Sequence, residues 1–140
     1  MVINQLSVFV ENKRGRLAEI TRILTENQID IRALSIADTK EYGILRLIVS
    51  DPFQAEAALK ENGFTVSVTK VIGIGIADRP GGLYEAMKLL YDRSISVEYM
   101  YAFISRLKDK AYVILRVDDD SEAIKLLTDN GFSVMTVDDI

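Results

Sequence analysis

Two short loops carry the residues best suited to hold a small charged molecule. The first contains Asn12, Arg14 and Gly15, and the second, 66 residues later, contains Asp78 and Gly81. Each is expected to lead from a strand into a helix, whose free N–H groups and positive dipole end suit a carboxylate. Glycine lets a ligand approach the backbone, and Asn12 or Asp78 can accept a hydrogen bond from an ammonium group. An amino acid offers both groups, although helix capping by Asn or Asp explains the same residues without a ligand.

The two loops belong to a repeat that covers the whole chain. Residues 10–17, VENKRGRL, reappear as residues 76–83, IADRPGGL. Further along, Asn-Gly-Phe at 62–64 recurs at 130–132, where the offset has grown to 68 residues. A repeat of this length defines the unit of structure, so we expect two similar units.

Six elements in each unit must hold these loops in place. They follow the order strand, helix, strand, strand, helix, strand. In the first unit the apolar patterns predict strands at 3–10, 29–37, 43–49 and 64–71, with helices from Gly15 to about 28 and from 52 to 62. In the second they predict strands at 71–77, 95–104, 111–117 and 132–137, with helices at 82–93 and 120–130. Right-handed crossovers turn this order into an α+β, ferredoxin-like fold, with an antiparallel sheet and both helices on one face. We place the units at residues 1–70 and 71–140, with no linker between them.

Three acidic residues, Asp118-Asp119-Asp120, could suggest a cation site. Acidic side chains are also favoured at a helix N-terminus by the helix dipole, and this is the simpler interpretation. In the same way Asp51 followed by Pro52 predicts a capped helix start, and Gly63 predicts a helix end.

The sheet face away from the helices is expected to be covered by something. Strand 43–49 is apolar on both sides, with Leu45 and Leu47 pointing one way and Ile48 the other. Gly73 and Gly75 lie on the open side of strand 71–77, where a neighbour could come close. We therefore expect a homodimer, because large exposed apolar surfaces usually mark contact sites.

Composition excludes several classes of protein. The chain has 140 residues and 49% apolar content, with no cysteine and no histidine. This removes thiol nucleophiles, the usual general base and most zinc sites, so we predict no catalytic residue, no metal and no cofactor. A net charge of −4 without a basic cluster disfavours nucleic-acid binding. No apolar run reaches the length of a membrane span and the N-terminus shows no export signal, so a cytoplasmic protein is expected.

The loop pattern D/N-x-P-G-x-L, opening the first helix of a βαββαβ unit, resembles the ACT domain, a small amino-acid-sensing module. Asp78, Pro80, Gly81 and Leu83 match this pattern in full. The first loop matches it except that Arg14 replaces the usual proline. The resemblance covers nearly the whole chain and is greatest to small proteins made of two ACT units alone.

The resemblance implies a ligand site that lies between two units, formed by the first loop of one unit and the start of the second strand of another. It implies the following candidates: Asn12, Arg14, Gly15, Leu17 and Asp30 in the first unit, and Asp78, Gly81, Leu83 and Ser96 in the second. Asp78 beside Asp30 would place two carboxylates together, which repel. We therefore predict that the first loop, with Ser96 or Asp30 opposite, is the better carboxylate site.

The leading interpretation is a non-catalytic sensor that binds a small amino acid and passes its binding state to a metabolic enzyme or regulator. The main alternative is a structural or protein-interaction module whose loops bind nothing. An acylphosphatase-like enzyme would need a phosphate-cradling loop with a placed Arg and Asn, which neither loop shows. A ferredoxin-like nucleic-acid-binding domain is disfavoured by the acidic balance.

Overall fold

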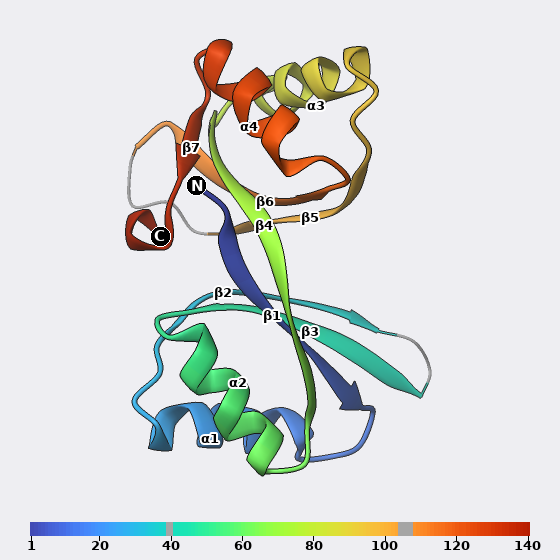
Figure 1. Ribbon diagram of the computed structural model, residues 1–140, viewed down its shortest axis with the longest axis vertical. Coiled ribbons are helices and arrows are strands. Elements are labelled where there is room, and N and C mark those ends of the chain that lie inside the picture. The colour runs from blue at the N-terminus through green and yellow to red at the C-terminus, as the bar shows by residue number, and fades with distance from the viewer. Residues whose placement is uncertain (39–40, 104–107) are drawn as a thin grey trace. The chain divides into compact units, whose positions relative to one another are not determined.

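The computed structural model spans residues 1–140 and describes residues 1–38, 41–103 and 108–140 (Figure 1). The chain forms two compact units. The N-terminal unit is Asn4–Thr69, and the C-terminal unit joins Met1–Ile3 to Lys70–Ile140. The predicted unit boundaries, 1–70 and 71–140, stay a prediction.

The N-terminal unit has the predicted order of elements. They are β1 (Ile3–Glu11), α1 (Arg16–Glu26), β2 (Ile31–Asp38), β3 (Tyr42–Val49), α2 (Pro52–Glu61) and the first part of β4 (Thr65–Ala77). The strands lie in the order β2-β3-β1-β4, and both β1 and β2 pair antiparallel with β3. Helices α1 and α2 contact each other on one face of these strands (Figure 1).

The C-terminal unit repeats this arrangement. After the second part of β4 come α3 (Gly82–Asp92), β5 (Val97–Phe103), β6 (Lys110–Val117), α4 (Asp120–Asp129), β7 (Ser133–Met135) and the short 3-10 helix η1 (Val137–Asp139). Strands β4 and β5 pair antiparallel with β6, and β7 pairs with β4. The register repeats as well, since Leu6 faces Leu47 in one unit and Ile72 faces Leu115 in the other. The expected α+β, ferredoxin-like fold is confirmed.

Each unit has a core of its own between its helices and its strands. In the N-terminal unit, Ile20 and Leu59 from the helices are fully buried against Leu6 and Val8 of β1. In the C-terminal unit the corresponding core includes Leu90, Ala123 and Ile74. Burial of this apolar surface is what holds the helices on the sheet.

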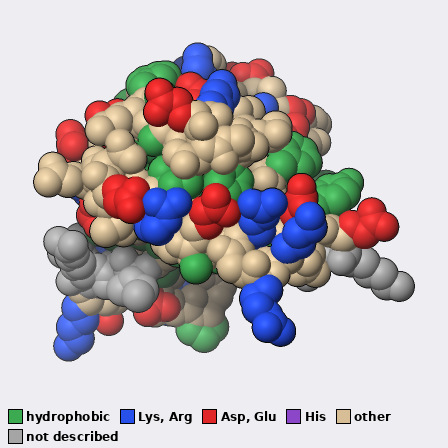
Figure 2. Space-filling model, turned by 90° about the horizontal axis from the view of Figure 1, so that it is seen from below, with side chains coloured by type: hydrophobic (Ala, Val, Ile, Leu, Met, Phe, Trp, Pro, Cys, Tyr) green, Lys and Arg blue, Asp and Glu red, His purple; other side chains and the backbone are tan. Residues whose placement is uncertain are grey.

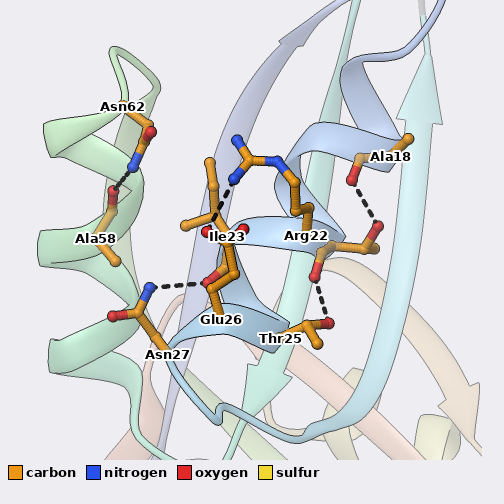
Figure 3. Close-up of polar contacts among 9 residues, drawn as sticks. Ala18, Arg22, Ile23, Thr25, Glu26, Asn27, Ala58 and Asn62 are labelled. Atoms are coloured by element: carbon orange, nitrogen blue, oxygen red, sulfur yellow. Dashed lines mark hydrogen bonds and ion pairs between the residues drawn. The ribbon is translucent and has the colours of Figure 1, made fainter.

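Polar side chains form hydrogen bonds at the starts and at the ends of the helices. Asp51 accepts a hydrogen bond from the N–H of Gln54 at 3.1 Å, and Asp119 accepts one from the N–H of Glu122 at 3.1 Å. Asp119 therefore acts as a helix cap. At the other end, the Nδ2 atoms of Asn27 and Asn62 donate to carbonyl oxygens four residues earlier, at 2.8 Å each (Figure 3).

The structure corrects two expectations about strands. The strand predicted at 132–137 is shorter, because Thr136 and Asp139 form a reciprocal cap that turns the backbone into η1. The strands predicted at 64–71 and 71–77 are one strand of 13 residues, β4. Residue 104, at the end of a predicted strand, lies outside the described residues.

The face of β4 that was expected to be open is covered by the chain itself. Gly73 is buried, and a Cβ there would meet Ile3 Cδ1 at 3.0 Å and Met135 Cβ at 3.5 Å. Gly75 is also buried and lies 3.5 Å from the ring of Tyr112, measured from the same hypothetical atom. These glycines therefore give no support to a second subunit at this face.

Candidate ligand-binding site

The two first loops have the same backbone conformation. Gly15 and Gly81 are the N-cap residues of α1 and α3, with φ of 87° and 89°. This left-handed conformation is costly for residues with a Cβ, which explains glycine at both positions. An added Cβ would meet no atom within 4 Å at either glycine, so the space beside each helix start is open.

Glycine occupies the N-cap position of both helices, so neither helix start has a hydrogen bond from an N-cap side chain. Asn12 and Asp78 lie three residues earlier and are not the N-cap residues. The N–H groups of Arg16 and Gly82, the first in each helix, donate to the carbonyls of Lys13 and Arg79 at 3.4 Å and 3.0 Å. The N–H groups that follow in the first turn of an α-helix have no partner within the helix, so they can bind a ligand or water. Both helix starts thus offer donors and open space together.

Matched backbone hydrogen bonds fix the two loops. The N–H of Asn12 donates to the carbonyl of Glu41 at 2.9 Å, and that of Asp78 to the carbonyl of Asp109 at 3.0 Å. These bonds tie each loop to the residue just before the third strand of its unit. Asn12 and Asp78 are both exposed at these equivalent places.

The side chains around the loops differ. In the first loop Lys13 Nζ lies 2.8 Å from Glu11 Oε2, and this contact lowers the pKa of the Glu11 carboxyl. Arg14 is exposed and forms no hydrogen bond or ion pair with any residue that the structure describes. In the second loop Pro80 stands in its place, and Arg79 pairs with Glu85 at 2.9 Å. The first loop therefore holds an unpaired cation that the second lacks.

Gly82 has a steric role. A Cβ at this position would overlap the carbonyl oxygen of Ala77, so α3 lies against the end of β4 more closely than a side chain allows. The equivalent residue in the first loop is Arg16, which extends to Glu19 at 3.1 Å. The second loop has less side-chain bulk, but Gly82 is held in place by packing.

The leucines of the two loops are placed differently. The side chain of Leu17 is 45% exposed. Leu83 is half-buried and packs against the core of the C-terminal unit. Leu17 is the second residue of α1 and lies outside the buried set that includes Ile20 and Leu24.

Asp30 and Ser96 directly precede β2 and β5, at the opposite end of each unit from its first loop. The N–H of Asp30 donates to Ser50 Oγ at 2.9 Å, and the N–H of Ser96 donates to Asp118 Oδ1 at 3.0 Å. Ser50 follows β3, whereas Asn12 is bound to the residue before β3. At roughly 3.3 Å per residue this strand separates the two ends by about 26 Å. A single unit therefore does not bring Asn12 together with Asp30, or Asp78 together with Ser96.

A groove that the sequence patterns do not predict occurs at the same place in both units. We call them the N-terminal groove, of about 250 Å³, and the C-terminal groove, of about 450 Å³. The turn Asn-Gly-Phe lines both, through Asn62, Gly63 and Phe64 in one and Asn130, Gly131 and Phe132 in the other. This repeated tripeptide was the available signal, but its glycine also fits a plain helix end.

Metal sites and membrane-spanning helices are both absent from the described residues. Among residues 1–38, 41–103 and 108–140, no group of His, Cys, Asp or Glu side chains is arranged to hold a metal ion. Within the same described part of the chain, no helix has the length and apolar character needed to cross a membrane. On the face shown in Figure 2, acidic and basic side chains are interspersed. This face therefore lacks the single-sign basic patch typical of nucleic-acid binding.

Comparison with known proteins identifies the family. A family model described as an ACT domain pair matches residues 1–140. The chain is 40% identical to protein BT0572 from Bacteroides thetaiotaomicron, with a TM-score of 0.93 over 99% of this chain and 95% of that one.

More distant structures share the fold. The regulatory subunit of aspartate kinase from Thermus thermophilus, in a ligand-free form, is 13% identical, with a TM-score of 0.66 over 93% of this chain and 94% of that one. The regulatory subunit of aspartate kinase from Thermus flavus is 12% identical, with a TM-score of 0.61 over 91% and 92%. No curated protein matches the chain. The match along the whole length, together with two βαββαβ units, shows that the chain belongs to the ACT domain family as a pair of ACT units.

Proposed function

We propose that the chain is a non-catalytic regulatory protein that binds a small amino acid at its first loops. The observation that carries this proposal is the pair of glycine-headed helix starts without side-chain caps, each with open space beside it. The ligand carboxylate would accept hydrogen bonds from the N–H groups that follow Arg16 in α1 or Gly82 in α3. Its ammonium group would donate to Asn12 or Asp78.

A complete site also needs a second ACT unit. Asp30 and Ser96 are candidate contacts, but each lies a strand's length from the loop of its own unit. We therefore propose that the loop of one unit meets the second-strand start of another unit in a homodimer. The ligand would then stabilise the packing of the units, and a partner enzyme or regulator would sense that packing.

The proposal is tested by thermal unfolding of the protein with each of the twenty amino acids. A ligand that binds only the folded state raises the unfolding temperature, by an amount that grows with its concentration. We expect one amino acid, or a few related ones, to do so. If none raises the unfolding temperature at 10 mM, the alternative of a structural or interaction module with inactive loops is favoured instead.

A further inference from the structure

Several lining residues of the two grooves occupy equivalent positions in the two units, so the grooves can be compared residue by residue. The N-terminal groove is lined by Phe9, Glu11, Arg16 and Tyr42 besides the Asn-Gly-Phe turn. The C-terminal groove has Gly75 where the other has Phe9, Ala77 for Glu11 and Lys110 for Tyr42.

Large side chains fill the N-terminal groove. The rings of Phe9 and Tyr42 are 6.1 Å apart between centroids, and the guanidinium of Arg16 lies 5.9 Å from the centroid of the Phe64 ring. The C-terminal groove has no side chain at Gly75, and it also extends along α3 past Tyr84 and Leu89. It is the larger of the two grooves.

The opening at Gly75 is not required by the backbone. Its φ lies outside the left-handed region, and an added Cβ would meet ordinary contacts of 3.5 Å or more. A Cβ therefore fits at Gly75, with Tyr112 and Ser133 as its nearest neighbours, whereas Gly82 is fixed by its close packing on Ala77.

Most charges around the C-terminal groove are already paired. Lys88 Nζ lies 2.7 Å from Asp92 Oδ2, and this contact raises the pKa of Lys88. Glu85 pairs with Arg79 at 2.9 Å. Lys110 is exposed and has no hydrogen bond or ion pair within the described ranges, so one positive charge remains unpartnered.

The rest of the lining is apolar or weakly polar. Ile76, Leu89 and Phe132 supply apolar surface, and Tyr84 is an exposed ring at the edge. Asn130 Nδ2 already donates to the carbonyl of Leu126 at 2.8 Å. The groove thus offers an aromatic and aliphatic surface beside a single free cation.

We propose that the C-terminal groove is a second ligand site, separate from the first loops, for a small carboxylic acid with an aromatic body. The carboxylate pairs with Lys110, and the ring packs on Phe132 and Tyr84. A volume of about 450 Å³ is within the range of small-molecule sites. The filled N-terminal groove, with Tyr42 in place of Lys110, does not bind this ligand.

The test is a two-dimensional amide NMR titration of the full chain with 3-phenylpropionate. This probe has no ammonium group, so it does not depend on the amino-acid site at the first loops. We expect saturable shifts at the amides of Gly75, Gly131 and Phe132, and none at Gly63 and Phe64. The uncharged match, 3-phenyl-1-propanol, should bind more weakly. Equal binding of the two probes, or no saturable shift up to 10 mM, would overturn the proposal.

Single variants test the charge of Lys110 and the absence of a side chain at Gly75 separately. Lys110→Gln should weaken binding about 2- to 5-fold, as for an exposed ion pair. Lys108→Gln removes a charge from the same turn but not from the groove, and should leave binding unchanged. Gly75→Phe restores the residue type of the N-terminal groove and should abolish the shifts. If Lys110→Gln binds as tightly as Lys108→Gln, or if folded Gly75→Phe still binds, the assignment is wrong.

Discussion

At the scale of single residues, the two loops show how one backbone can carry unequal chemistry. Gly15 and Gly81 set the same helix start, yet Asn12 and Arg14 face solvent in one loop and Asp78 and Pro80 in the other. A free N–H and a free guanidinium favour a carboxylate at the first loop, because Arg matches its two oxygens. At the second loop, the negative charge of Asp78 would instead repel a ligand carboxylate.

We therefore predict that Asn12→Ala loses more affinity than Asp78→Ala for whichever amino acid raises the unfolding temperature. Removing a hydrogen-bond partner of the ammonium group should cost about 1–2 kcal/mol, or roughly 10-fold in affinity. Isothermal titration calorimetry of both variants measures this. Equal losses, or a loss confined to Asp78→Ala, would show that the ranking of the loops is wrong.

The contact of Glu11 with Lys13 makes a second prediction. The pKa of Glu11 is lowered from its ordinary value of 4.5, mainly by the hydrogen bond from Lys13 and then by its charge. A lowered folded-state pKa stabilises the fold above the unfolded pKa, and this contribution is lost as the pH falls through the folded one. Carboxyl NMR titration should place Glu11 below 4.5 in the native chain and close to it in Lys13→Gln.

At the scale of elements, the sequence predicts what depends on local patterns. Alternation in β1 and the Asp51-Pro52 start of α2 follow from nearby residues, and the structure bears them out. The coverage of Gly73 could not be predicted, because Ile3 and Met135 reach it from distant parts of the chain. The exposure of Leu17 depends in the same way on where its helix meets the sheet.

The candidate site was predictable only in part. The glycines that start α1 and α3 are recognisable from sequence, since a left-handed residue before a helix favours glycine. The distance between a loop and its partner strand depends on β3 lying between them, which a loop motif does not contain. The C-terminal groove is lined by residues of β4, of α3 and of the turn at 130–132, which only the fold brings together.

The junction of β4 and α3 predicts a contrast between two glycines. Gly82→Ala forces a Cβ onto the Ala77 carbonyl, and the backbone must shift, so we expect a loss of about 1–3 kcal/mol in the free energy of unfolding. Gly75→Ala has space for its Cβ and should change stability by less than about 1 kcal/mol. Urea denaturation of both variants measures the difference, and equal effects would argue against the close packing at Gly82.

At the scale of the whole molecule, the main prediction is self-association. The loop and strand candidates of one unit lie at opposite ends of it, so a site that uses both requires a second unit. Leu17, Leu34 and Ile36 of the N-terminal unit are each 45–55% exposed, which adds apolar surface for contact. We expect light scattering at micromolar concentration to give twice the chain mass of 15.7 kDa. A mass of one chain would contradict the proposed homodimer.

The discontinuous C-terminal unit has a consequence for how the chain folds as it leaves the ribosome. Asn4–Thr69 is a continuous stretch and can close its core as soon as it has emerged. The other unit needs Met1–Ile3, made first, and Met135, made more than a hundred residues later, because both Ile3 and Met135 pack at Gly73. During synthesis Ile3 therefore lacks its native contacts until Met135 has been made, although the rest of β1 can already be folded. The N-terminal unit can fold in the order in which its residues are made, whereas the C-terminal unit cannot.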